Sequence, residues 1–234
     1  MAREAGARQP DEVPPSAEEE TIRPGRTAAF SDGVFAIAAT LLVLDIRVPA
    51  GGDLLGAILH AWPAYASYAV SFLTIGIIWM NHHTIFEQLR RVDRPLLVIN
   101  LFLLMVVALI PFPTALLAAQ LQAGHDEAVA GATYGITMAA MGALFGVLWA
   151  YVLRRDDLRT TAIDAVRKRT LLARFGIGAP VYAAGIGMAF VNARISLALY
   201  AALALYYLLE QVPLRSPGGG SGPSSTDGPP PLRR

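Results

Sequence analysis

Six long apolar segments constrain the fold of this chain more than any other feature of its sequence. The hydrocarbon core of a bilayer is about 30 Å thick, and a helix needs about 20 apolar residues to cross it. The sequence therefore predicts an all-α membrane protein with six transmembrane helices per subunit. A hydrophobic share of 54% beside only 16% charged residues agrees with this class. The segments lie at about residues 28–46, 60–82, 95–121, 128–153, 171–191 and 194–212.

The two ends of the chain differ in composition from the apolar region between them. Residues 1–25 are rich in Pro, Glu, Ala and Arg, and residues 213–234 are rich in Gly, Ser and Pro. Segments of this kind cannot bury enough apolar surface to fold. We therefore expect a disordered N-terminus, a six-helix membrane domain over residues 26–212, and a flexible C-terminal tail.

The positive charges of the chain are distributed unevenly. All Lys and Arg residues except Arg47 and Arg194 fall on one side of the predicted helices. Because cytoplasmic loops carry the excess of Lys and Arg, we expect a multi-pass protein of the cell membrane with both termini in the cytoplasm. Segment 154–170 is a charged connector, with a lipid-headgroup role as the alternative. A net charge of +1 does not suggest nucleic acid as a partner, so the lipid bilayer is the expected surrounding.

The first apolar segment carries ionisable residues at both ends. Arg26 and Asp32 lie near its start, and Asp45 and Arg47 lie near its end. A charged side chain in the membrane costs about 3 kcal/mol by insertion scales. Asp32 must therefore have a partner or a function.

The helical period divides this segment into two faces. At 3.6 residues per turn, Asp32 points away from a stripe of bulky apolar side chains. It falls instead on a face of small residues, Ala36, Ala39 and Val43, which favours tight helix packing. Spacing alone is compatible with a simple lipid or protein contact for the stripe. The stripe contains Phe30, Val34, Ile37, Leu41 and Leu44, with Thr40 at its border.

Polar residues from several spans are predicted to meet near the cytoplasmic end. Alternate spans run in opposite directions, so the start of span 1, the end of span 2 and the start of span 3 share one depth. Buried polar groups need hydrogen-bond partners. We therefore predict a network that fastens the first span to its neighbours. In this network Ser31 and Asp32 would bond to Trp79, to His82 or His83, and to Asn100; Asn81 and Arg174 lie at the same depth.

The sequence gives little support for an enzyme or a metal site. His82 and His83 are adjacent, and the nearest acid is Glu87, so the i, i+4 histidine spacing of a zinc helix is missing. The chain has no cysteine, and it shows neither a Ser–His–Asp set nor a glycine-rich phosphate loop. We expect no catalytic residues, no metal and no cofactor.

Proline and glycine mark two further features of the spans. Pro111 and Pro113 lie within span 3, where proline removes a backbone donor and favours a kink. Span 4 contains two pairs of glycines four residues apart, a spacing that favours close helix packing. These pairs are Gly131 with Gly135 and Gly142 with Gly146.

The motif Arg26-x-x-x-Phe30-Ser31-Asp32 resembles the signature of the endosomal/lysosomal potassium channel family (transmembrane protein 175 type) and its prokaryotic homologues. The resemblance continues through Val34-Phe35-Ala36-Ile37 and Thr40-Leu41-Leu42. It includes Trp79, the histidine pair, and Asn100 followed by Pro111-Phe112-Pro113. It covers about residues 26–212.

This resemblance implies a potassium-selective, leak-type channel without a carbonyl filter loop. In that family the first helices of the assembled subunits line the pore. Ile37, Leu41 and Leu44 would form a hydrophobic constriction, and Thr40 would present a hydroxyl to the permeating K⁺. Arg26, Phe30, Ser31 and Asp32 would be structural. Because the signature occurs once in this chain, the resemblance implies a homotetramer.

Some alternatives remain open from the sequence. Asp45 belongs either to a ring of carboxylates at the outer mouth or to a local pair with Arg47. The alternatives to a channel are a secondary transporter and a non-conducting membrane scaffold. Transporters usually combine inverted repeats with broken helices that meet at the membrane midplane. Pro111 and Pro113 could mark one broken helix, but the other half of the chain has no matching segment.

Overall fold

A computed structural model describes residues 23–46, 52–160 and 178–211, and these are nearly all helical. Residues 1–22 and 213–234, on which most of the expected disorder falls, lie outside the described residues, as does the first part of the predicted span 171–191. The elements are α1 (Pro24–Leu41), η1 (Leu42–Asp45), α2 (Leu54–His60), α3 (Trp62–Glu87), α4 (Arg94–Leu109), α5 (Pro111–Ala123), α6 (Glu127–Arg154), η2 (Asp156–Leu158), α8 (Gly178–Ala189) and α9 (Ala193–Gln211).

Five of the described helical segments are long and apolar enough to cross a membrane. They match five of the six predicted spans. The remaining span, 171–191, is described only from α8 onward. The five segments are Pro24–Asp45, Trp62–Glu87, Arg94–Ala123, Glu127–Arg154 and Ala193–Glu210.

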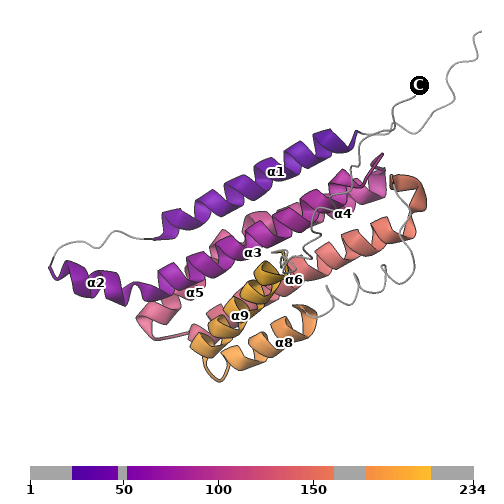
Figure 1. The fold of residues 1–234 in the computed structure, drawn as a ribbon. Coiled ribbons are helices and arrows are strands. Elements are labelled where there is room, and N and C mark those ends of the chain that lie inside the picture. Colours follow the sequence, from indigo (N-terminus) through magenta and orange to yellow (C-terminus); the bar gives the residue numbers. More distant parts are fainter. Residues whose placement is uncertain (1–22, 47–51, 161–177, 212–234) are drawn as a thin grey trace, which may run out of the picture.

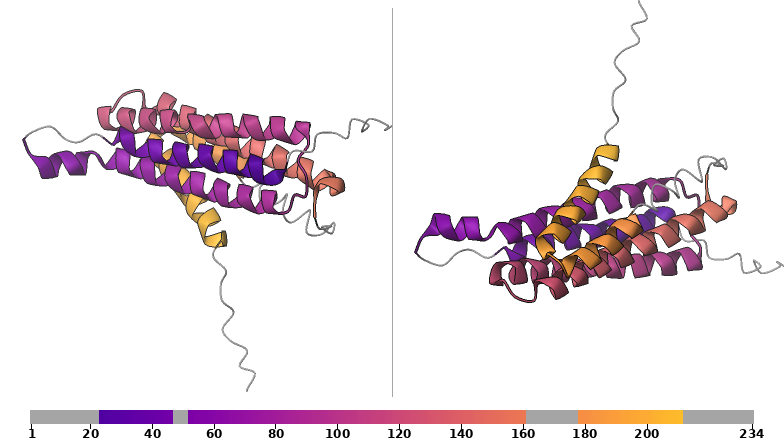
Figure 2. Two further views of the ribbon diagram at one scale, coloured as in Figure 1. Left: turned by 90° about the horizontal axis from the view of Figure 1, so that it is seen from above. Right: turned by 90° about the horizontal axis from the view of Figure 1, so that it is seen from below.

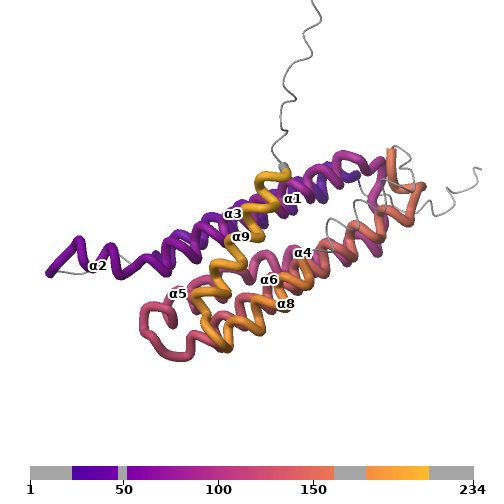
Figure 3. The backbone as a smooth tube through the Cα atoms, turned by 60° about the horizontal axis from the view of Figure 1, so that its bottom comes forward, coloured from indigo at the N-terminus to yellow at the C-terminus, as the bar shows by residue number. Residues whose placement is uncertain are grey.

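The helices form an elongated bundle with α1 along one side (Figure 1). Seen from above, α1 lies between α3 and the α4–α5 pair, with which it makes its contacts (Figure 2). On the opposite side, α8 and α9 form a hairpin against α6 (Figure 3). The bundle therefore places α1 at its edge, with one face packed and the other uncovered.

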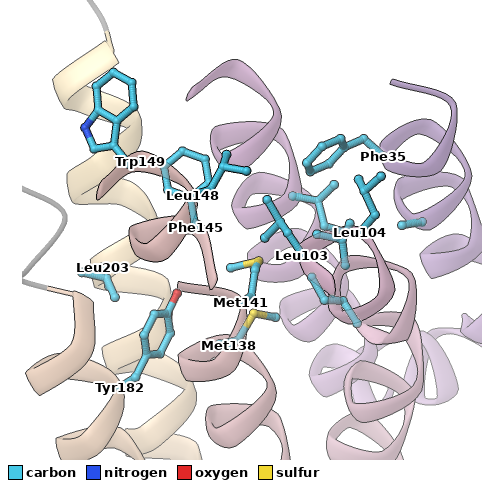
Figure 4. Close-up of a cluster of buried hydrophobic side chains, with 14 of the residues drawn as sticks. Phe35, Leu103, Leu104, Met138, Met141, Phe145, Leu148, Trp149, Tyr182 and Leu203 are labelled. Carbon is cyan, nitrogen blue, oxygen red and sulfur yellow. The ribbon is translucent and has the colours of Figure 1, made fainter. Parts of the chain in front are cut away.

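Within the single chain, α1 packs on the bundle through the side of Phe35. Its buried residues are Thr27, Ser31, Phe35 and Ala38, whereas Ala36 and Val43 of the small-residue face are exposed. The Phe35 ring lies on the α4 side of the core, near Leu103 and Leu104 (Figure 4). Within the single chain the large Phe35 ring makes the contact with the core because its burial is favourable, and Ala36 and Ala39 of the small-residue face border a groove between α1 and α3.

Pro111 interrupts the long apolar segment 95–121, as predicted. The segment divides into α4 and α5 at Ile110, whose own amide donates to Val107 O at 3.1 Å. Pro111 has no amide hydrogen, so the helical bond that this residue would donate is missing. The helix resumes with a bond of 3.2 Å from Thr114 N to Ile110 O.

The second span begins and ends later than predicted, and it follows a short helix that was not predicted. Helix α3 runs to Glu87 instead of ending near residue 82, because an α-helix satisfies its own backbone even where polar side chains line its end. The short helix α2 is capped at its start by Asp53, whose side chain accepts a bond of 3.0 Å from Gly56 N. Seven residues are too few for a periodic apolar pattern to stand out from the sequence.

The two glycine pairs of α6 have different surroundings. A side chain at Gly131 would approach the Cβ of Ala189 to 3.0 Å, and one at Gly135 would overlap Tyr200, so the first pair packs closely as predicted. Gly142 and Gly146 instead line a cavity of about 250 Å³ between α3, α6, α8 and α9. For this second pair the packing prediction was wrong.

Candidate pore-lining helix and its polar network

Three buried polar side chains join α1, α3 and α4 near one end of the bundle. Asn100 Nδ2 donates to Ser31 Oγ at 3.0 Å, and Asn100 Oδ1 lies 2.8 Å from His82 Nε2. Ser31 Oγ in turn donates to Thr27 O at 2.9 Å. Because an amide oxygen can only accept, His82 Nε2 must carry the hydrogen of this bond. The Asn100 amide thus links the serine of α1 to the histidine of α3.

His82, and not His83, takes part in this network. The His82 ring lies between two phenylalanines, with its centroid 5.3 Å from that of Phe35 and 4.3 Å from that of Phe86. His83 lies on the exposed side of α3, where its Nε2 is 3.2 Å from Glu87 Oε1. The aromatic contacts therefore set the rotation of α3 that turns His82 inward.

Asp32 has its partner on α3. Trp79 Nε1 donates to Asp32 Oδ1 at 2.9 Å. Both residues line a groove of about 610 Å³ between α1 and α3, together with Ala36, Ala39 and Gly76. The carboxylate predicted to need a partner is thus hydrogen-bonded at the edge of an apolar groove. The side chain of Arg26 is exposed at the start of α1, and Arg174 lies outside the described residues.

The aliphatic stripe of α1 is uncovered in the single chain. Ile37 is 61% exposed, Leu41 41% and Leu44 73%, and Phe30 is exposed beside them. Thr40 is also exposed, with its Oγ1 2.9 Å from Ala36 O and 3.0 Å from Ile37 O. Because its hydrogen is directed to the helix backbone, the hydroxyl can act only as an acceptor toward its surroundings.

Asp45 ends η1 at the opposite end of α1 from the polar network. It borders a hollow of about 410 Å³ whose lining includes His60 and Gln122. Arg47, the alternative partner of Asp45, lies outside the described residues.

A second polar cluster, which sequence reasoning missed, joins the loop between α3 and α4 to the segment after α6. Leu89 and Arg159 form an antiparallel bridge. Arg90 N donates to Leu158 O at 2.9 Å, and Thr160 N donates to Gln88 O at 2.9 Å. The prediction treated the charges after α6 as a solvated connector, and its first residues are instead docked on the neighbouring loop.

Ion pairs hold this docked segment. Asp157 accepts bonds of 2.8 Å from both Nε and Nη2 of Arg155, and a further one from Arg91. These guanidinium groups hold the pKa of the Asp157 carboxyl well below its usual range. Arg155 also lies 3.1 Å from Asp93, which accepts a bond of 2.7 Å from Tyr151. In the sequence, two adjacent arginines, Arg154 and Arg155, directly precede two adjacent aspartates, Asp156 and Asp157. This pattern is the sequence signal that could have indicated the ion pairs.

The first part of the chain matches a known membrane protein family. The sequence model of the endosomal/lysosomal potassium channel TMEM175 matches residues 26–111, which include most of α1 and all of α3 and α4. A potassium channel of Streptomyces collinus is 48% identical over 194 residues, which cover 81% of this chain and 94% of that protein.

Similarity extends to a solved structure and to animal proteins. The crystal structure of a lysosomal potassium-selective channel TMEM175 homologue from Chamaesiphon minutus superposes with a TM-score of 0.71. It is 34% identical and covers 80% of this chain and 97% of that one. The endosomal/lysosomal proton channel TMEM175 of Bos taurus is 35% identical over 119 residues, which cover 46% of this chain and 25% of that protein.

These relatives are ion channels by name, in agreement with the expectation of a membrane protein that is not an enzyme. The long shared alignment with the Streptomyces channel includes most of both proteins. The multi-pass helical fold and the hydrogen bonds of Ser31 and Asp32, the last two residues of the motif, fit the same assignment. The chain therefore belongs to the TMEM175 family of potassium channels.

Proposed function

We propose that four copies of this chain form a passive, potassium-selective channel whose pore is lined by α1. The potassium channels among its relatives support this function. The observation that carries the proposal is the division of α1 into two faces. One face is buried and hydrogen-bonded to α3 and α4, whereas the other presents Ile37, Leu41 and Leu44 without cover.

In this proposal the uncovered side chains form stacked apolar rings around the pore axis. Such a constriction can close by losing its water and conduct when it widens. Potassium loses hydration water at a lower cost than sodium, which favours its passage through an apolar constriction. Four Thr40 hydroxyls, each able to accept but not donate, would offer partial compensation for the lost water.

Two features of the chain support assembly as a homotetramer. The groove between α1 and α3 is lined by Ala36, Ala39 and Gly76, and small residues let a neighbouring helix approach closely. The signature motif occurs once in the chain, so several chains are needed to surround an axis. Ser31, Asp32 and Trp79 then act by holding α1 in register, with no contact to the ion.

The proposed topology has six spans per subunit, with α8 as the described part of the fifth span. Both termini lie in the cytoplasm and the channel in the cell membrane. The distribution of Lys and Arg along the sequence supports this orientation. The end of α3, the start of α4 and the end of α6, together with the arginines beside them, would then face the cytoplasm.

Single-cysteine variants test the proposed pore directly, because the chain has no natural cysteine. The variants Ile37→Cys and Leu101→Cys are compared in planar bilayers during treatment with a charged methanethiosulfonate reagent. Leu101 is a matched control because it is 59% exposed, close to the 61% of Ile37, but lies on α4. We expect the reagent to block potassium current through Ile37→Cys and to leave Leu101→Cys unchanged.

Replacing Ile37 with Asn gives a second, independent measurement. A polar ring stays hydrated, so we expect a larger conductance and weaker discrimination between potassium and sodium than in the wild type. Leu101→Asn should leave both quantities unchanged. A wild-type protein that passes no cation would overturn the function, and an Ile37→Cys channel insensitive to the reagent would overturn the placement of α1 at the pore.

A further inference from the structure

A cavity of about 250 Å³ lies inside the bundle between α3, α6, α8 and α9. Its walls are mostly aliphatic side chains, glycines and the aromatic rings of Phe145, Trp149, Tyr182 and Tyr207. Figure 4 shows three of these rings, Phe145 and Trp149 on α6 and Tyr182 on α8. Small-molecule sites between the helices of a bundle are largely apolar and carry few polar groups. The lining of this cavity therefore favours an uncharged, apolar ligand.

Two glycines of α6 create much of the space in the cavity. A Cβ added at Gly146 would meet no atom within 4 Å, and one added at Gly142 would lie 3.9 Å from Tyr182 Cε2. A Cβ added at Gly135 of the same helix would instead overlap Tyr200. The wall beside Gly142 and Gly146 thus leaves room that a larger side chain or a ligand can fill.

The polar side chains that α3 contributes to the lining are hydrogen-bonded within their own helix. Thr74 Oγ1 donates to Val70 O at 2.8 Å, and Asn81 Nδ2 donates to Ile77 O at 2.8 Å. These bonds satisfy the two side chains without a water or a polar ligand as partner. Because apolar cavities stay dry and take up apolar molecules, a hydrocarbon ring system is the class of ligand that fits.

Two lining residues mark the opening of the cavity. Ala143 of α6 and Ala179 of α8 border the cavity and are also exposed. Ala143 lies near the middle of α6, a helix of 28 residues that is apolar enough to cross a membrane. The middle of such a helix lies in the hydrocarbon core of the bilayer, and α8 lies on the side of the bundle opposite α1 (Figure 3). The opening therefore faces lipid.

The volume and the rings of the cavity narrow the size and the kind of ligand. An engineered apolar cavity of about 150 Å³ in another protein binds benzene. A volume of about 250 Å³ therefore has room for one substituted ring or two fused rings. Aromatic rings pair favourably in offset-stacked and edge-to-face arrangements, so a lining with four aromatic side chains favours a flat aromatic ligand over an aliphatic one.

We propose that this cavity binds a small, uncharged aromatic molecule that enters from the bilayer between α6 and α8. The ligand packs against the rings of Phe145, Trp149 and Tyr182 and takes the space beside Gly146. The site is separate from the uncovered face of α1, so its occupancy does not depend on potassium conduction and can be measured without ionic current.

Quenching of tryptophan fluorescence by bromobenzene tests this site in the purified full chain in neutral detergent. Bromine quenches an indole on contact, and Trp149 lines the cavity, whereas Trp62 and Trp79 are partly exposed elsewhere. Probe dissolved in the micelle quenches in proportion to its concentration, but a bound probe adds a saturable component. We expect the wild type and Trp62→Phe to show this component and Trp149→Phe to lack it.

The variants Gly146→Leu and Gly187→Leu separate filling of the cavity from the general effect of an added side chain. Both glycines are helical, and a Cβ at either would meet no atom within 4 Å. Gly187 is not among the described residues that line the cavity. We expect Gly146→Leu to abolish the saturable component and Gly187→Leu to keep it. Gly142→Leu provides the same measurement if Gly146→Leu does not fold.

The outcomes distinguish an aromatic ligand from another occupant and from no binding. A wild type quenched only in proportion to the bromobenzene concentration overturns the proposal, as does a saturable component that persists in Trp149→Phe or in Gly146→Leu. Lipids brominated on their acyl chains are titrated in parallel. If only these lipids give a saturable component that Gly146→Leu removes, the occupant is an acyl chain and the proposed aromatic ligand is wrong.

Discussion

The indole of Trp79 donates to the carboxylate of Asp32 across the contact between α3 and α1, over a distance of 2.9 Å. Replacing Trp79 with Phe removes this donor and keeps an aromatic ring. We expect a loss of about 1–2 kcal/mol in stability, below the range for a fully buried bond to a charged group because Trp79 is partly exposed. Titration with sodium dodecyl sulfate in mixed micelles measures the change.

Trp62→Phe is the matched control for this prediction. Trp62 is 43% exposed, close to the 40% of Trp79, and its ring faces the Arg194 guanidinium instead of a carboxylate. A Phe ring keeps most of that contact. Equal losses for the two variants would contradict a specific bond between Trp79 and Asp32.

Asn100 is hydrogen-bonded to buried partners on α1 and on α3. Replacing Asn100 should therefore cost more stability than replacing Trp79. In Asn100→Leu the Ser31 hydroxyl and the His82 imidazole both lose a partner inside the bundle. At about 1–3 kcal/mol for each unsatisfied group, we expect a loss of about 2–4 kcal/mol. His83→Ala, which breaks only an exposed contact with Glu87, should change stability by less than about 1 kcal/mol. Similar stability of both variants would show that the network contributes little.

The glycines of α6 and α8 should respond to alanine in opposite ways. A Cβ added at Gly185 of α8 would overlap the Tyr200 ring, whereas one added at Gly146 of α6 would meet no atom within 4 Å. We expect Gly185→Ala to lower the melting temperature clearly, because overpacking costs about 1–3 kcal/mol. Gly146→Ala should be neutral or stabilising by up to about 1 kcal/mol through its better helix propensity. A destabilised Gly146→Ala variant would contradict the open space at this site.

The ion pairs of Asp157 should make part of the stability dependent on pH. The Arg155 guanidinium first, and Arg91 second, lower the pKa of this carboxyl below its unfolded value of about 4. Its contribution is therefore fully present above that value and is lost as pH falls through the lowered folded-state pKa. We expect the wild type to melt at a higher temperature than Asp157→Asn by a constant margin between about pH 8 and pH 5, and by a smaller margin near pH 3. A margin that grows on acidification would have the wrong sign.

Asp45 provides a conductance test that depends on the proposed pore. Four Asp45 carboxylates at the outer mouth of the pore would concentrate cations at low ionic strength, because the Debye length is about 30 Å at 0.01 M. We expect Asp45→Asn to reduce potassium conductance in dilute salt, and the difference to vanish near 1 M. Asp45→Glu should restore conductance. An equal conductance of wild type and Asp45→Asn in dilute salt would instead favour a local pairing of Asp45.

The meeting of polar residues at one end of the bundle could be predicted from the order of the spans. Because consecutive spans run in opposite directions, the distance of a residue from the end of its span gives its depth in the membrane. This reasoning predicts that Ser31, Trp79 and Asn100 lie close together. The choice between His82 and His83 could not be made in this way. It depends on the rotation of α3, which the rings of Phe35 and Phe86 determine through tertiary packing.

Packing also explains the other differences from the sequence-based prediction. A helical wheel identifies faces but not which face is buried, so the sequence of α1 does not predict that the side of Phe35 packs on the core of the single chain. The same limit applies to the two glycine pairs of α6, which have equal spacing and different neighbours. Arg159 was read as part of a solvated connector because nothing in its local sequence shows that Leu89 lies opposite it.

The side-chain hydrogen bonds from α1 to other described helices come from Ser31 and Asp32, both in the first half of the helix. Beyond them, the helix is held to its neighbours by apolar contacts such as those of Ala38 and Leu42. Directional bonds resist displacement more strongly than apolar contacts, which tolerate small sliding. A sideways swing of α1 about Ser31 and Asp32 would therefore move Leu44 further than Ile37 and would leave these two hydrogen bonds intact.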